Sequence, residues 1–327
     1  MSITIKDVAK DTGLSTATIS KYLNHRSISD QNRKLIEESI QKLHYVPNRA
    51  AQGLRSKNSH SVCIFMSDLS NYKFGYICNY IVTEMKNNGF STMIRTYSAQ
   101  DPMQDILFLK KRQIDGVILF TEAAYPSSLV MQLSMNKIPY ICMQQMPDIP
   151  SDFVGCSDEA SGARAAEYLY QCGHTKAALL GIESYSSARR IQGFMDAMMA
   201  HGIAAEDQAM YLHSADTQWD EAWCRNTFSC LKQTAIVFLD HMSTLQTIGY
   251  FIRPRENQAN QALLAFDDDE LFMAISPALT VIDQDSYTIG QKAAALLLRR
   301  MGGDFADFPA TYLIDPILIE RESVQKL

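Results

Sequence analysis

The sequence lacks the features that define several other classes of protein. None of its apolar runs approaches the roughly 18 residues needed to cross a bilayer, and its first ten residues are polar and charged, unlike a secretory signal peptide. The seven cysteines are odd in number and include no C-x-x-C pair, which argues against zinc sites and disulfides. We therefore expect a cytoplasmic protein with no membrane contact, no metal and no cofactor.

Common enzyme motifs are also missing. The chain contains no G-x-x-x-x-G-K-S/T, no G-x-S-x-G and no H-E-x-x-H, and its seven histidines are isolated in sequence. We therefore assign no catalytic residue. Two alternatives stay open at this point: an enzyme whose site is assembled from distant residues, and a small-molecule-binding protein without a regulatory role.

What is present describes an ordinary globular chain with an uneven division of charge. The 327 residues are 46% hydrophobic and 20% charged, and a chain of this length usually forms two or three domains. Residues 1–60 hold ten basic and five acidic side chains, a formal charge of +5, which leaves −11 for the rest of a chain with net charge −6. A basic module on an acidic body is expected when only the module meets phosphate.

The first 47 residues predict a three-helix helix-turn-helix. Thr4 and Asp7 nearly form a capping box for a helix that Gly13 ends. Ser15 is a good N-cap for a second helix through Asn24, in which Ile19 faces the first helix. A third apolar pattern opens at Ser29 and supplies its core face through the following residues: Leu35, Ile36, Ser39, Ile40 and Leu43.

In such a unit the second helix enters the major groove with its amino end first. The exposed residues after its cap are Thr16, Ala17 and Lys21, which we expect to contact bases. Hydroxyl and amide side chains near the helix ends are predicted to contact phosphate, although for each one taken alone plain helix capping is the better explanation. These residues are Thr4, Ser15, Ser20, Asn24, Ser29 and Asn48.

The segment TIKDVAKDTGLSTATISKYLN at 4–24 resembles the lactose-repressor (LacI) family of bacterial transcription regulators, and HYVPNRAAQGLRSKNS at 44–59 continues the match. The resemblance implies a hinge helix and linker over residues 48–60, which pairs with a second copy in the minor groove. Ala51 and Leu54 would lie there, with Leu54 as the wedge that kinks the central base step. The alternative is that this segment is only a linker.

From Ser61 onward, apolar runs of strand length alternate with helical patterns, which predicts α/β architecture with parallel sheets. This part resembles the periplasmic-binding-protein-like core of the same family. The resemblance implies an effector-binding and dimerisation core over 61–327. Its first lobe would comprise about 61–156 and 286–310, and its second lobe about 157–285 and 311–327.

The same resemblance implies an effector site between the lobes. ARRIQGFMDAM at 188–198 places the family's effector-contacting arginine at Arg190, and AFDDDEL at 265–271 places its acid at Asp267. The remaining predicted contacts are Ser70, Asn71, Lys73, Phe74 and Asp240. An arginine and a carboxylate facing each other can bind a polyol, or the arginine alone can bind an anion. Three departures from the family pattern weaken the sugar interpretation: Leu239 stands where many members have an asparagine, Ser157 stands where an aspartate often opens the second lobe, and Lys73 would add a positive charge. We therefore hypothesise a ligand with an anionic group.

Together these features predict a sequence-specific DNA-binding transcriptional regulator, most simply a repressor. Its partners would be a pseudo-palindromic double-stranded DNA operator, a second copy of the chain in a homodimer, and a small-molecule effector. The expected effector is a sugar, a sugar phosphate or a similar metabolite.

Overall fold

A computed structural model describes residues 3–23, 27–45, 59–66, 72–97, 101–120, 127–144, 149–214, 219–229, 231–252 and 261–327. The side chains at positions 72, 73, 127 and 221 are outside this description. The chain divides into two compact units, Met1–Ser59 and His60–Leu327. Within the described part, no helix combines the length and apolar character that a membrane span requires.

The first unit, which we call the headpiece, contains three helices: α1 (Ile5–Thr12), α2 (Thr16–Leu23) and α3 (Asp30–Leu43). Its core consists of Val8, Ile19, Ile36 and Tyr45, one residue from each helix and one from the segment after α3. Leu35 does not belong to this core, because it is 40% exposed. It lies one residue, or about 100° around the helix, from Ile36 and so points away from the buried face.

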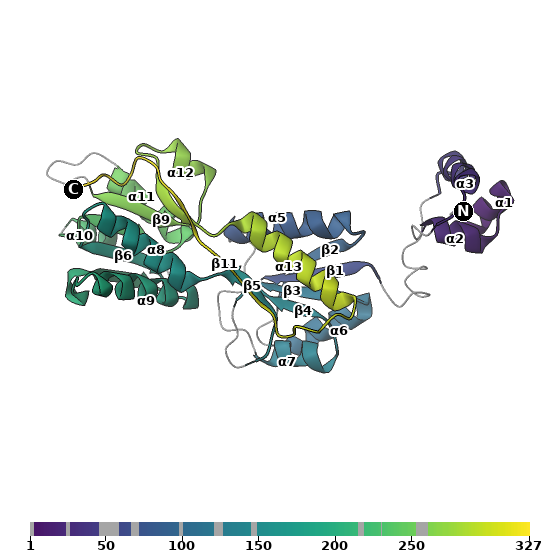
Figure 1. Ribbon diagram of the computed structural model, residues 1–327, viewed down its shortest axis with the longest axis horizontal. Helices are drawn as coiled ribbons and strands as arrows, with labels where there is room; N and C mark the ends of the chain where they lie inside the picture. The colour runs from purple at the N-terminus through teal and green to yellow at the C-terminus, as the bar shows by residue number, and fades with distance from the viewer. Residues whose placement is uncertain are drawn as a thin grey trace. The chain divides into compact units, whose positions relative to one another are not determined.

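The second unit contains two lobes, each built on a six-stranded sheet (Figure 1). The first sheet has the order β11-β5-β4-β3-β1-β2 and is parallel throughout. Its strands are β1 (Ser61–Met66), β2 (Ser91–Thr96), β3 (Gly116–Phe120), β4 (Tyr140–Cys142), β5 (Phe153–Cys156) and β11 (Thr311–Ile314).

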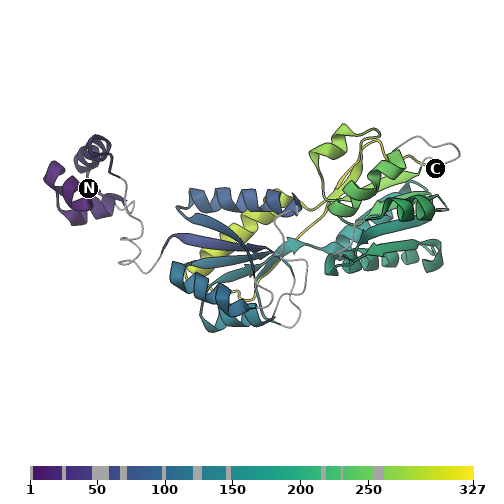
Figure 2. The same ribbon diagram turned by 180° about the vertical axis from the view of Figure 1, so that it is seen from behind.

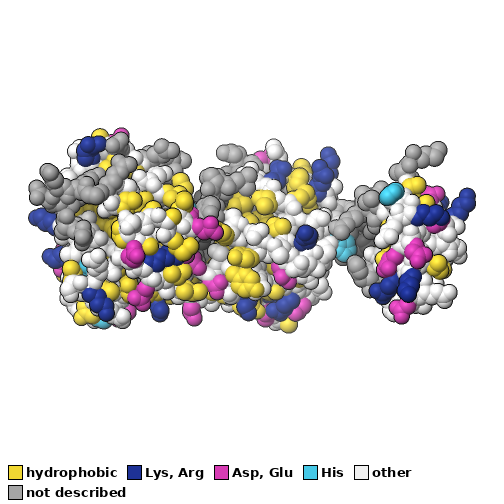
Figure 3. All heavy atoms as spheres, turned by 90° about the horizontal axis from the view of Figure 1, so that it is seen from above, with side chains coloured by type: hydrophobic (Ala, Val, Ile, Leu, Met, Phe, Trp, Pro, Cys, Tyr) yellow, Lys and Arg dark blue, Asp and Glu magenta, His cyan; other side chains and the backbone are white. Residues whose placement is uncertain are grey.

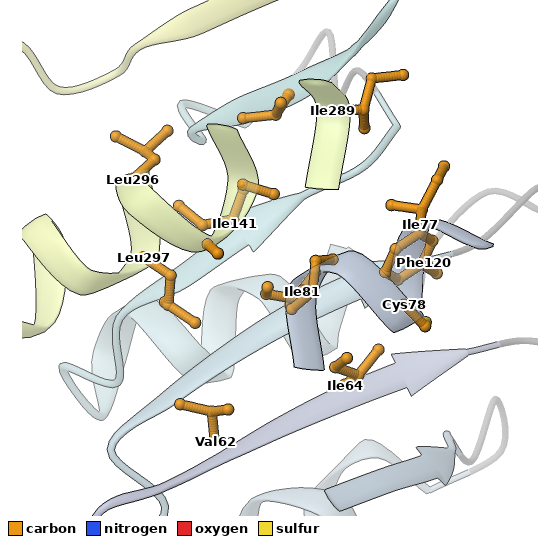
Figure 4. Close-up of a cluster of buried hydrophobic side chains, with 14 of the residues drawn as sticks. Val62, Ile64, Ile77, Cys78, Ile81, Phe120, Ile141, Ile289, Leu296 and Leu297 are labelled. Carbon is orange, nitrogen blue, oxygen red and sulfur yellow. The ribbon is translucent and has the colours of Figure 1, made fainter. Parts of the chain in front are cut away.

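Helices cover both faces of this first sheet (Figure 2). On one face lie α5 (Tyr72–Asn87) and α13 (Ser286–Met301), which pack against the β1 residues Val62 and Ile64; Figure 4 shows this cluster, with Ile81 of α5 and Leu297 of α13. On the other face lie α6 (Pro102–Arg112) and α7 (Ser127–Met135). The continuous burial of β1 and β3 is what a central parallel strand requires.

The second sheet has the order β12-β10-β9-β8-β6-β7 and is parallel except for its antiparallel edge strand β12. Its strands are β6 (Ala177–Ile182), β7 (Ala209–His213), β8 (Ala235–Phe238), β9 (Ala262–Phe266), β10 (Thr280–Asp283) and β12 (Ile317–Ile319). A short 3-10 helix, η1 (Ala205–Asp207), precedes β7.

One face of the second sheet packs against α8 (Asp158–Gln171) and α9 (Tyr185–Ala200). The opposite face packs against α10 (Glu221–Phe228), α11 (His241–Ile252) and α12 (Glu270–Ala274).

The boundary between the lobes differs from the sequence-based prediction at the last crossing. Residues 311–327 were expected in the second lobe, yet β11 pairs with β5 over Thr311–Ile314 and so lies in the first sheet. Only β12 joins the second sheet, through β10. The chain therefore crosses between the lobes after Cys156, between β10 and α13, and between β11 and β12.

Candidate functional site

The helix ends of the headpiece are capped by the residues that the sequence suggested as phosphate contacts. The Asp7 carboxylate accepts hydrogen bonds from the backbone N and the Oγ1 of Thr4, both at 2.7 Å. Ser15 Oγ accepts from the backbone N of Thr18 at 3.1 Å, and Ser29 Oγ accepts from the backbone N of Asn32 at 3.4 Å. All three predicted residues are exposed, so capping leaves them accessible to a second partner.

The predicted base-reading residues form an exposed surface on α2. Thr16, Ala17 and Lys21 are all exposed, whereas Ile19 on the opposite side of the helix is fully buried. Tyr22, on the same helix, donates its hydroxyl hydrogen to Glu37 of α3 at 3.1 Å. On the face of the headpiece seen in Figure 3, Lys and Arg side chains lie at the surface together with acidic ones. Ser20, a predicted phosphate contact, is partly buried.

Several predicted contacts lie outside the described residues. They are Asn24, Asn48, Ala51, Leu54, Ser70 and Asn71, together with the side chain of Lys73.

A cavity of about 270 Å³ lies between the two lobes. Phe74, Phe120 and Phe153 of the first lobe line it with apolar rings, and the rings of Phe74 and Phe120 are 5.1 Å apart. The second lobe contributes polar groups from the amino-terminal parts of two helices: Asp158 and Glu159 of α8, and Tyr185, Ser186 and Arg189 of α9. Phe74 therefore lies in an interlobe cavity whose first-lobe wall combines apolar rings with the polar side chain of Gln144.

A smaller cavity of about 40 Å³ brings together Arg190, Asp240 and Asp267, the three other predicted effector contacts that the structure describes. Ser186 lines both cavities, so the two spaces adjoin. The predicted residues are therefore divided, with Phe74 in the larger space and the charged residues in the smaller one.

Arg190 is buried and already surrounded by acceptors. Its side chain is 2% exposed, and its Nε donates to Asp158 Oδ1 at 2.9 Å. One terminal nitrogen donates to the carbonyl oxygen of Leu239 and lies 3.6 Å from Asp267 Oδ2. Burial lowers the pKa of the guanidinium, but the carboxylates of Asp267 and Asp158 outweigh burial, so the pKa lies above its ordinary value. Arg190 thus stays charged and matched by two carboxylates.

The approach of α8 to α9 that joins these residues depends on two glycines. A Cβ at Gly162 of α8 would lie 1.9 Å from the backbone oxygen of Arg190, and a Cβ at Gly193 of α9 would lie 2.0 Å from that of Glu159. Each glycine therefore lies against the backbone of the other helix at the residue that borders the site. Asp158 reaches Arg190 because no side chain separates the two helices there.

The two carboxylates predicted as effector contacts are largely engaged within the protein. Asp240 immediately precedes α11, and its carboxylate oxygens accept from the backbone N of Ile182 at 2.8 Å and from the backbone N and the Oγ of Ser243 at 2.7 and 2.8 Å. Asp267 has a left-handed φ of 67° and accepts from Gln284 Nε2 at 2.8 Å. Asp240 consequently stabilises the start of α11 in addition to lining the small cavity.

Sequence reasoning missed Asp158. Ser157 is the N-cap of α8, and its Oγ accepts from the backbone N of Ala160 at 3.2 Å. The next residue makes the ion pair with Arg190. The available signal was the pair of small residues at 162 and 193, one turn from each charged residue, but its meaning depends on the tertiary contact.

Comparisons with known proteins agree with this organisation. Residues 4–48 match the family described as bacterial regulatory proteins, lacI family. Residues 59–225 match the periplasmic binding proteins and sugar binding domain of LacI family, and residues 166–324 match a periplasmic binding protein-like domain.

Relatives match the chain over nearly its full length. The transcriptional repressor PurR of Mannheimia succiniciproducens is 25% identical, with 99% of each chain covered. The ribose operon repressor of Escherichia coli is 27% identical, covering 98% of this chain and 99% of the relative. The lac repressor dimer bound to operator and the anti-inducer ONPF superposes with a TM-score of 0.81 at 22% identity, covering 99% of this chain and 100% of the other.

The chain belongs to the LacI family of bacterial regulatory proteins. It combines the DNA-binding headpiece of that family with its effector-binding core.

Proposed function

We propose that the protein is a homodimeric transcriptional repressor whose affinity for a pseudo-palindromic operator is controlled by a small-molecule effector. The observation that carries this proposal is the presence in one chain of a helix-turn-helix with an exposed α2 surface and a two-lobed core with an interlobe cavity. The repressor relatives and the operator-bound lac repressor dimer support it.

In this account the headpiece reads sequence through α2. Lys21 donates hydrogen bonds to guanine O6 and N7, while the methyl groups of Thr16 and Ala17 contact thymine methyl groups. Thr4, Ser15, Ser20, Asn24, Ser29 and Asn48 hold the phosphates. Ala51 and Leu54 belong to the hinge, where paired leucines kink the central base step.

The effector binds between the lobes, with Ser70, Asn71, Lys73 and Phe74 on the first lobe and Arg190, Asp240 and Asp267 on the second. Three chain crossings connect the lobes, so a ligand that contacts both walls changes their relative orientation. The size of the resulting switch equals the difference in DNA affinity between the liganded and unliganded states. The protein works by binding alone, with no chemical step, in the bacterial cytoplasm where its operator is found.

The experiment that tests this function is selection of bound duplexes from a random DNA pool by the full-length protein at near-physiological salt. We expect recovery of a palindrome with two half-sites and a flexible central step. A selection that recovers no common sequence, with or without a pool of metabolites, would contradict the proposed function.

A further inference from the structure

Asp158 occupies the edge of the Arg190 guanidinium to which an anionic ligand would bind through hydrogen bonds. A guanidinium binds carboxylates and phosphates best with two parallel N–H groups. In this protein the Nε of Arg190 donates to Asp158 at 2.9 Å, and a terminal nitrogen is taken by Leu239 and approached by Asp267. The described residues that line the larger cavity include Asp158 but not Arg190. A ligand in the larger cavity therefore contacts the carboxylate of Asp158 there, and it reaches the guanidinium of Arg190 only from the adjoining smaller cavity.

The described charged side chains around both cavities, which do not include that of Lys73, also disfavour an anion. The charged side chains among the described lining residues are Asp158, Glu159, Asp240, Asp267, Arg189 and Arg190. They leave an acidic excess of two, and Arg189 is itself paired with Glu159 at 2.8 Å. The amino end of α9 adds roughly half a positive charge, which does not offset this excess. The amino end of α8 carries Asp158 and Glu159 in its own first turn.

Asp158 retains the capacity to bind a donor. Its Oδ1 accepts from Arg190, whereas Oδ2 has no hydrogen-bond partner among the residues that the structure describes. The side chain is 20% exposed. On the first-lobe side, Phe74 and Phe153 retain a little exposed ring surface that suits the carbon skeleton of a small ligand. An ionised carboxylate accepts hydrogen bonds and donates none.

We propose that Asp158 is the specificity-determining residue of the effector site, which excludes anionic ligands and selects one that presents a hydrogen-bond donor, a hydroxyl or an ammonium group. This inference rests on the proposed function and replaces the anionic ligand that the sequence suggested. The positive charge of Arg190 is balanced by Asp158 and Asp267 within the protein. Arg190 therefore holds the side chains of the second-lobe wall in place and does not bind the phosphate of a ligand.

Removing the carboxylate tests the role of Asp158 without knowledge of the natural effector. Inorganic phosphate is titrated calorimetrically into three full-length proteins: the wild type, Asp158→Ala and Glu206→Gln. Glu206→Gln is the control, because it removes one exposed carboxylate on η1 that lines neither cavity. We expect Asp158→Ala to bind phosphate at least about ten-fold more tightly than the other two proteins, because loss of the carboxylate frees the Nε of Arg190 to donate to the phosphate. Equal phosphate affinity in Asp158→Ala and Glu206→Gln would overturn the proposal. If Asp158→Ala fails to fold, Asp158→Asn, which keeps the shape and removes the charge, is judged by the same comparison.

A second measurement uses the wild type and a panel of monosaccharides, each as neutral sugar, amino sugar and sugar phosphate. We expect every phosphate to bind more weakly than its parent sugar, and the ranking of amino and neutral sugars to show which donor Asp158 prefers. Tighter binding of a sugar phosphate than of its parent would contradict the proposal. Failure of any small molecule to alter DNA binding would count against the proposed function, whereas the role of Asp158 is decided separately by the phosphate titration.

Discussion

Gly162 of α8 lies directly against the backbone oxygen of Arg190 of α9, so closely that a Cβ at position 162 would be 1.9 Å from that oxygen. The neighbouring atoms are backbone, and they cannot move aside as the end of a flexible side chain can. The close approach of the two helices, and with it the ion pair between Asp158 and Arg190, therefore depends on the missing side chain at Gly162 as well as on that at Gly193.

We expect Gly162→Ala to destabilise the core by about 2–3 kcal/mol, the upper range for overpacking of a tightly packed interior. Urea unfolding followed by circular dichroism measures the change. The matched control is Gly249→Ala in α11, where a Cβ would meet nothing within 4 Å and where alanine favours a helix by roughly 0.5–1 kcal/mol. Equal stability of the two variants would show that α8 and α9 can separate without cost.

A buried ion pair fixes α13 to the first sheet. Arg300 donates through Nε and a terminal nitrogen to both oxygens of Asp152, at 2.7 and 2.8 Å, and both side chains are at most 1% exposed. We expect Asp152→Ala to lower the free energy of unfolding by about 3–5 kcal/mol, because it leaves a buried guanidinium short of a partner. Asp304→Ala removes an exposed partner of Arg299 and is expected to change stability little. A small effect of Asp152→Ala in urea unfolding would contradict this account.

Three buried thiols are predicted to be unreactive in the folded protein. Burial raises the pKa of Cys63, Cys78 and Cys142 to about 12. Since the thiolate is the reactive form, iodoacetamide labelling at mildly alkaline pH should modify these residues only after unfolding, as read by mass spectrometry. Rapid labelling in the native protein would contradict the burial.

The same thiols bear on stability at high pH. Their folded pKa lies above the value of about 8.5 for an unfolded chain, so the unfolded state releases protons first. Their contribution to stability is fully present below that pH and declines as pH rises above it.

Lys21 is the predicted base-reading residue with the longest reach. We expect Lys21→Ala to relax base preference at one position of each half-site, at a cost of about 1–3 kcal/mol on the preferred operator. Fluorescence anisotropy on operators changed one base pair at a time measures it. Lys10→Ala, on the outer side of α1, provides a comparison at another exposed lysine. An equal loss of affinity for all operator sequences would show that Lys21 contacts phosphate and not a base.

The sequence predicted those parts of the molecule whose signals are local. The structure confirms the predicted helix caps at Thr4, Ser15 and Ser29 and the predicted central strand Gly116–Phe120. Both kinds of signal depend only on residues that are close together in the sequence. The placement of β11 was wrong, since an alternating strand pattern does not specify which of two sheets the strand joins.

The candidate site was predictable in part. The family motifs located Arg190, Asp240 and Asp267, and these residues do line one cavity. The motifs could not show that the charge of Arg190 is already paired with Asp158. Asp158 is 32 residues away in the chain and contacts Arg190 only because α8 packs against α9.

The most direct test of ligand-controlled DNA binding is a reciprocal titration with the full-length protein. Operator affinity is measured by anisotropy with and without a saturating cleft ligand, and ligand affinity is measured by calorimetry with and without operator DNA. We expect both affinities to change by the same factor, in the range of about 5–150-fold typical of allosteric coupling. An operator affinity that is unchanged at saturating ligand would contradict it.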